Sequence, residues 1–307
     1  MKFLGKDPNI IDAYYTATAE GAITAGKPVI VEVDGDVAVV ATTVDPTPSA
    51  GTATVFESAT TNWVSAAYDT NAEKVVVAYQ DNGNSSKGTA VVGTVSGTSI
   101  SFGTPVVFES GDTRNISIVY DANAQKVVIV YKDNGNSNKG TAIVGTVSGT
   151  SISFGSAALF QDGVVDEMSA VYDSSSQKVV VAYKDDDNNN YGTARVGTVS
   201  GTSISFGSDT VFESAFVTDT SIAYDANAQK VVIAYADIGN SNYGTAIVGT
   251  VSGTSISFGS PTVFESANCN AGYIRAAYDA NAQRIVIAYR DQGNSSYGTA
   301  IVGTARS

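Results

Sequence analysis

The chain has 307 residues, of which 43% are hydrophobic, and a formal net charge of −13 at pH 7. This length and composition predict a folded core and argue against disorder. The negative charge argues against nucleic acid or an anionic membrane surface as a partner, and no run of about eighteen apolar residues would span a membrane. The N-terminus has no apolar stretch of the kind that secretory signals carry, and the single cysteine excludes an intrachain disulfide.

The first 45 residues form a segment of their own. Residues 17–43 predict three short strands, with turns at 26–28 and 34–36. So small a β-rich segment needs a partner surface to be stable, so we expect residues 1–45 to dock against another protein. The docking residues expected are Ile23, Pro28, Val29 and Val31. Pro46 and Pro48 then mark a short, stiffened linker.

A tandem repeat fills the rest of the chain. Tyr-Asp pairs recur at 68–69, 120–121, 172–173, 224–225 and 278–279, at spacings of 52, 52, 52 and 54 residues. The block GTVSGTSISFG occurs four times, and VFES recurs with LFQD as its third copy. A period of about 40–50 residues is typical of propeller blades.

Each repeat predicts four strands, a to d. In the second repeat these are residues 115–120, 126–132, 141–147 and a strand from 152 that breaks at Gly155. Short β-branched and aromatic runs between polar turns indicate strands, and the short connections indicate an antiparallel meander.

We therefore predict an all-β chain in which residues 46–307 form a five-bladed β-propeller of four-stranded antiparallel blades, after a small β-rich N-terminal segment. The fifth repeat stops after its third strand, and residues 51–58 match the end of a fourth. These residues are expected to pair beside 299–304 and close the ring. An open solenoid is one alternative. A six-blade ring, with residues 28–42 as part of a degenerate blade, is another.

The sequence holds no histidine, which excludes the common Ser-His-Asp and Cys-His mechanisms and histidine-ligated metals. Most acids recur once per repeat, which indicates turns or contacts between blades. Asp166-Glu167 is an adjacent acidic pair that no other repeat carries at this place, but neighbours on a strand point to opposite faces. We therefore predict no catalytic residues and no enzyme, with a glycosidase as an alternative because that chemistry needs only two acids.

The b–c loops, such as DNGNSSKG at 81–88, cluster Asp, Asn and Ser. They fit Asx turns, and they could also bind Ca²⁺ or sugar hydroxyls; no other cofactor is expected. These loops share a rim with the d–a segments, which differ between repeats, whereas the turns on the other rim are nearly identical. We expect the varied rim to bind partners through the following residues: Trp63, Arg114, Phe216, Tyr273, Arg275, Tyr191, Tyr243 and Tyr297.

Units of the pattern VFES…AYDANAQKVVIAY…YGTAIVGTVSGTSISFGS resemble virion repeat proteins of marine bacteriophages over residues 50–307. The segment 16–41, with Ala22-Ile23, Ala25-Gly26 and Pro28-Val29 before Asp34-Gly35, resembles modules that open phage decoration and fibre proteins. The five-blade form resembles tachylectin-like propellers by architecture alone.

This resemblance implies a structural protein on the virion surface, a capsid decoration or fibre component that docks on other virion proteins and displays the propeller. A homo-oligomer in that assembly and adhesion to host glycans are expected. The alternative is a receptor-binding lectin module of a tail fibre.

Overall fold

The computed structural model describes residues 29–31, 37–39, 50–269 and 273–305. The chain divides into an N-terminal part, Met1–Ala50, and a repeat region, Gly51–Ser307. In the N-terminal part, β1 (Val29–Val31) pairs antiparallel with β2 (Val37–Val39). Ile23, Pro28 and the remaining predicted strand lie outside the described residues. No helix within the described ranges is long and apolar enough to cross a membrane.

The repeat region contains four complete units and a fifth of three strands. Unit 1 holds β3 (Thr61–Asp69), β4 (Lys74–Asp81), β5 (Lys87–Ser96), β6 (Ser99–Phe102) and the first half of β7 (Val106–Asp121). Unit 2 holds the rest of β7, β8 (Lys126–Asp133), β9 (Lys139–Ser148), β10 (Ser151–Phe154) and the first half of β11 (Ala158–Asp173). Unit 3 holds the rest of β11, β12 (Lys178–Asp185), β13 (Tyr191–Ser200), β14 (Ser203–Phe206) and the first half of β15 (Thr210–Asp225).

Unit 4 holds the rest of β15, β16 (Lys230–Asp237), β17 (Tyr243–Ser252), β18 (Ser255–Phe258) and β19 (Thr262–Asn268). Unit 5 holds β20 (Arg275–Asp279), β21 (Arg284–Asp291) and β22 (Tyr297–Gly303). Short 3-10 turns follow the second strand in units 1, 2, 4 and 5: η1 (Asn82–Asn84), η2 (Asn134–Asn136), η3 (Ile238–Asn240) and η4 (Gln292–Asn294).

Long strands join one unit to the next. The first half of β7 pairs with β5, Val106 opposite Ala90, and its second half pairs with β8, Ser117 opposite Val130. All pairings are antiparallel, and the all-β prediction is confirmed. We predicted separate d and a strands, but they run together as one strand of 16 residues. No proline interrupts β7, and register shifts absorb the change of partner.

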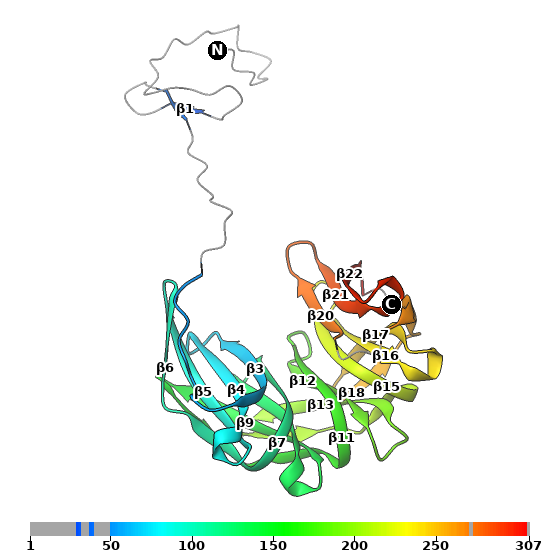
Figure 1. The fold of residues 1–307 in the computed structure, drawn as a ribbon, viewed down its shortest axis with the longest axis horizontal. Coiled ribbons are helices and arrows are strands. Elements are labelled where there is room, and N and C mark those ends of the chain that lie inside the picture. The colour runs from blue at the N-terminus through cyan, green and yellow to red at the C-terminus, as the bar shows by residue number, and fades with distance from the viewer. Residues whose placement is uncertain (1–28, 32–36, 40–49, 270–272, 306–307) are drawn as a thin grey trace. The chain divides into compact units, whose positions relative to one another are not determined.

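The units follow one another in chain order, and unit 1 (blue to cyan) and unit 5 (orange to red) lie at the two ends of the series (Figure 1). Residues 51–58 form no strand, and in the described part of the chain β22 pairs with β21 alone. The closed five-blade ring is therefore not confirmed, whereas the four-stranded antiparallel unit is.

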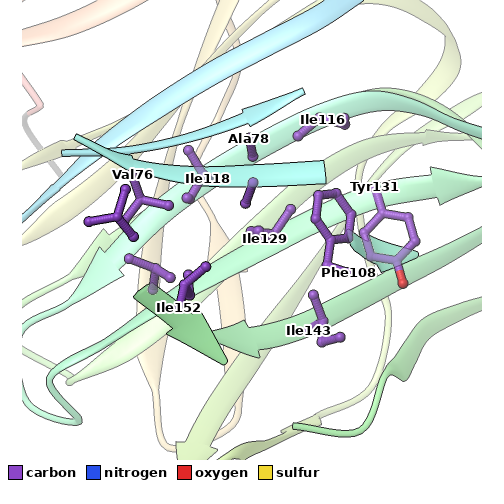
Figure 2. Close-up of a cluster of buried hydrophobic side chains, with 12 residues drawn as sticks. Val76, Ala78, Phe108, Ile116, Ile118, Ile129, Tyr131, Ile143 and Ile152 are labelled. Atoms are coloured by element: carbon purple, nitrogen blue, oxygen red, sulfur yellow. The ribbon is translucent and has the colours of Figure 1, made fainter. Parts of the chain in front are cut away.

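The core lies between consecutive units. Between units 1 and 2, Val76, Ala78 and Ile129 share one cluster, and the rings of Phe108 and Tyr131 lie beside Ile129 (Figure 2). Equivalent clusters join units 2 and 3, 3 and 4, and 4 and 5. The sheets of units 2, 3 and 4 therefore bury both faces, which explains second strands such as KVVIV that do not alternate between polar and apolar residues.

The acids that recur in every unit have structural partners, as predicted. Asp121 Oδ1 accepts the backbone N–H groups of Asn123 and Ala124 at 3.0 and 2.9 Å, which is an Asx turn. Glu109 accepts the Tyr131 hydroxyl at 3.0 Å. In unit 3, Gln161 replaces that glutamate, and the Tyr183 hydroxyl donates to Asp209 at 2.7 Å instead.

A repeated serine links the first strands of neighbouring units. Ser117 Oγ accepts the backbone N–H of Ala170 at 3.2 Å, and Ser65, Ser169 and Ser221 make the equivalent contact. Ser117→Ala should lower the free energy of unfolding by about 1–3 kcal/mol, because it leaves a largely buried N–H unpaired. Urea denaturation measures this against Ser99→Ala, at an exposed position. Equal midpoints for the two variants would contradict the role given to Ser117.

Candidate active site at the varied rim

The loops after the second strands and the segments that enter the next unit share one rim. The backbone N–H of Thr113 donates to Ser86 O at 3.0 Å, and that of Val217 donates to Asn190 O at 3.2 Å. Tyr191 lies opposite Phe216 in the strand register, so these two predicted binding residues come together. Tyr243 begins β17 in the same way.

The other predicted binding residues are spread along the rim. Trp63 is half exposed on unit 1. Arg114 pairs with Asp112 at 2.9 Å on unit 2. Tyr273, Arg275 and the exposed Tyr297 all belong to unit 5, where Tyr273 and Arg275 line one hollow. Their roles in binding stay predictions.

A bulge interrupts the first strand of units 1 to 4 at one repeated position. The residues there, which we call the bulge row, are Trp63, Asn115, Glu167 and Asp219, with φ of 50, 49, 49 and 57°. Residues other than glycine rarely adopt this left-handed backbone conformation, and backbone strain of this kind is concentrated at functional sites. The bulge re-aims the side chain and breaks the alternation of faces along the strand.

Side chains of the bulge row reach the following unit. Asn115 Nδ2 donates to Asp166 Oδ1, and Lys132 Nζ lies 3.4 Å from Asp166 Oδ2. The Glu167 carboxylate accepts a hydrogen bond from the backbone of Asp219, whose side chain is 4% exposed. Asp166 and Glu167 of unit 3 and Asp219 of unit 4 therefore form an acid cluster across the junction of these two units.

The surroundings of Glu167 act on the pKa of its carboxyl group. Burial raises the pKa of the Glu167 carboxyl, and the negative charges of Asp219 and Asp166 raise it further. The Lys184 ammonium acts in the opposite direction. A carboxyl group whose pKa is raised beside other carboxylates is an arrangement that general acid catalysis uses.

A cation and an aromatic ring lie beside the cluster. Lys184 Nζ sits 5.3 Å from the centroid of the Phe216 ring and 3.4 Å from Asp186. Phe216 is 40% exposed, so part of its ring is open to solvent at the rim. Sites for small molecules combine apolar surface with a few fixed polar groups of this kind.

The sequence identified two of the three acids of this cluster. Asp166-Glu167 stands out there as a unique pair. Asp166 contacts Asn115 and Lys132 of unit 2, whereas Glu167 contacts Asp219 of unit 4, so the two side chains meet different neighbouring units. Asn115 and Asp219 were missed. They occupy the same place in the repeat as Trp63, and this variation at a fixed place was the available signal.

Aspartates in the loops after the second strands accept hydrogen bonds from the backbone of their own loop. Asp81 Oδ1 accepts the backbone N–H of Asn84 at 3.1 Å, and Asp237 and Asp291 make the same contact. These contacts are those of N-caps. Among the residues that the structure describes, no three His, Cys, Asp or Glu side chains gather as a metal would require. Calcium binding stays an untested prediction.

Comparison with models of protein families and with curated proteins gave no match. Solved structures share the fold. The exo-β-1,3-galactanase of Phanerochaete chrysosporium, solved with β-1,3-galactotriose, matches with a TM-score of 0.51 and 9% identity over 78% of this chain and 59% of its own. The intramolecular trans-sialidase of Ruminococcus gnavus matches with a TM-score of 0.50 and 8% identity over 71% of this chain and 51% of its own. A Dyadobacter fermentans protein of unknown function matches with a TM-score of 0.53 and 11% identity over 80% of this chain and 79% of its own.

These likenesses establish a propeller-like all-β fold that glycoside-processing enzymes also use. They overturn our prediction that the chain is not an enzyme. That prediction rested on the missing histidine and on repeated acids, and neither excludes chemistry by two carboxylates. The chain spans little more than half the length of the galactanase and the trans-sialidase.

Proposed function

We propose that this chain cleaves glycosidic bonds at the acid cluster of Asp166, Glu167 and Asp219. The observation that carries the proposal is the placement of Glu167 on a strained bulge, where its half-buried carboxyl accepts a hydrogen bond from the backbone of the buried Asp219 across the junction of two units and feels the charge of that aspartate. Enzymes that cleave glycosides need a pair of carboxyl groups with divergent protonation. The fold shared with the galactanase and the trans-sialidase supports this class of substrate.

The two carboxyl groups take different roles. Glu167 donates its proton to the glycosidic oxygen as the bond from that oxygen to the anomeric carbon breaks. The negative charge of Asp219 then stabilises the positive charge on the sugar ring, or the Asp219 carboxylate attacks the anomeric carbon. A water molecule, whose proton passes to the Glu167 carboxylate, then bonds to the anomeric carbon and completes the hydrolysis. Asp166 accepts from Asn115 and Lys132, and its backbone neighbour Glu167 donates its N–H to the same carboxylate at 3.1 Å. These contacts hold the backbone at Glu167, the general acid, in place, so Asp166 acts as a positioning residue.

Asp219→Asn tests the electrostatic part of this proposal. The Asp219 charge raises the pKa of Glu167, so the neutral amide should lower that pKa. Because the general acid works in its protonated form, the alkaline limb of the pH–rate profile should move to lower pH. A full profile of kcat/KM on a glycoside measures the shift, with Asp225→Asn, a turn aspartate of the same strand, as the matched control. An unchanged alkaline limb, with activity retained, contradicts the pairing.

The second candidate function is glycan binding without cleavage, favoured by the exposed aromatic side chains at the rim. Trp63 and Tyr273 are 49% and 62% exposed. A glycan array should then show binding that Trp63→Ala and Tyr273→Ala weaken. Display on a virion through residues 1–45 stays a prediction of the resemblance, and immunolabelling of purified phage particles tests it.

A further inference from the structure

Every complete junction between units uses the same three residues: a phenylalanine, a glycine and a tyrosine. A phenylalanine from the last strand of one unit lies on a glycine of the third strand and packs against a buried tyrosine of the next unit. A side chain on Gly88, Gly140, Gly192 or Gly244 would clash with the rings of Phe108, Phe160, Phe212 and Phe264 respectively. Those rings lie 5.2–5.3 Å from Tyr131, Tyr183, Tyr235 and Tyr289.

Phe56 makes the contacts of a fifth junction on one side only, against unit 1. Its ring lies 5.1 Å from Tyr79 and 5.6 Å from Phe102 of unit 1, and three of its counterparts likewise contact a tyrosine and a phenylalanine of the next unit: Phe108, Phe160 and Phe212. Glu57 likewise accepts the Tyr79 hydroxyl. In the described chain, however, Phe56 has no glycine-bearing strand on its other side, and Val55 beside it is 77% exposed.

Unit 5 has the glycine and the space that a phenylalanine would fill in such a junction. Gly298 occupies the place of Gly88, yet nothing lies within 4 Å of where its side chain would be. A hollow of about 460 Å³ is present there, lined in part by Ala288, Gly298 and Ala300. The corresponding alanines of unit 1, Ala78 and Ala90, are fully buried under Phe108 and the next sheet.

The outward face of unit 5 has the composition of a buried face. Val302 is 62% exposed, whereas Val92, Val144 and Val196 at the same place are at most 1% exposed. On the facing side of unit 1, Tyr68 is 53% exposed. The hydroxyls of its counterparts Tyr120, Tyr172 and Tyr224 each accept a backbone N–H from the preceding unit at 3.2 Å.

We propose that residues 52–58 add to the free edge of β22 as its fourth strand, with Phe56 in the hollow over Gly298. By analogy with Gly88 opposite Glu109, Thr89 opposite Val107 and Ala90 opposite Val106, the register places Gly298 opposite Glu57, Thr299 opposite Val55 and Ala300 opposite Thr54. The strand comes from the same chain, because both halves belong to one repeat region and their effective concentration exceeds that of a second molecule. The repeat region then closes into a five-blade ring.

Cysteine crosslinking tests the register and the occupant together. In a Cys269→Ala background of the full chain, Thr54→Cys with Ala300→Cys should form an intramolecular disulfide, with both thiols lost and the protein monomeric on non-reducing gels. The control pair, Thr54→Cys with Val302→Cys, is two residues out of register and should link several-fold less, since a disulfide needs β-carbons about 3.8 Å apart. Disulfide-linked dimers would show that the strand comes from a second copy of the chain. Two free thiols would show that the proposed contact does not form. Either result overturns the proposal.

A charge on the exposed face gives an independent test. Val302→Asp should lower Tm by roughly 5–10 °C, because ring closure buries the carboxylate against unit 1. The matched control Val211→Asp, at a position 41% exposed within a complete junction, should change Tm little. If both variants have the Tm of the parent protein, the outward face of unit 5 is open to solvent and the ring does not close.

Discussion

Glu167→Gln is expected to lower kcat/KM for glycoside cleavage by about 10²–10⁴-fold, the range that general acid catalysis supplies. The amide keeps the size of the side chain and its hydrogen bond to the Asp219 backbone, but it has no acidic proton to give to the leaving oxygen. The loss should be largest for sugars with poor leaving groups and small for dinitrophenyl glycosides, which depart without protonation. Steady-state kinetics on a series of aryl glycosides measures this dependence.

Glu73→Gln is the matched control, because Glu73 lies on an exposed turn where the other units hold Gln125, Gln177, Gln229 and Gln283. Its activity should equal that of the parent chain. Glu167 is not the general acid if Glu167→Gln loses the same factor on every leaving group, or loses nothing.

Phe160→Ala should have the largest effect on stability, a loss of about 3–5 kcal/mol in the free energy of unfolding. Phe160 is fully buried between units 2 and 3, with ring centroids 5.2 Å from Tyr183 and 5.9 Å from Phe206. Truncation leaves a cavity over Gly140, which has no side chain to fill it. Guanidinium denaturation followed by tyrosine fluorescence measures the change.

Phe216→Ala serves as the control for size and composition, since Phe216 is 40% exposed at the rim. It should cost less than about 1 kcal/mol, as surface substitutions usually do. A similar small loss for Phe160→Ala would mean that the junctions between units are not the main source of stability.

The repeat made most of the fold predictable. The polar turns after Asp121 and the break at Gly155 both stand in the sequence, because turn residues act locally. The passage of β7 from one sheet to the next was missed, since its continuous run carries no proline and no turn signal. Closure of the ring depends on contacts between distant residues, and periodicity alone does not determine it.

The candidate site was harder to predict than the fold. A left-handed bulge at Glu167 or Asp219 has no glycine to mark it, so the sequence gives no local sign of the strain. The contact between these acids joins residues 52 positions apart in neighbouring units. Comparing the repeats position by position does show that this place varies while the scaffold around it does not.

A crystal structure of the Glu167→Gln variant soaked with an oligosaccharide that the parent chain cleaves tests the central claim most directly. We expect a sugar ring at the junction of units 3 and 4, with its glycosidic oxygen within about 3.2 Å of the amide that replaces the Glu167 carboxyl. A sugar bound only at the loops after the second strands, or on the opposite rim, would contradict the assignment of Glu167 as the general acid.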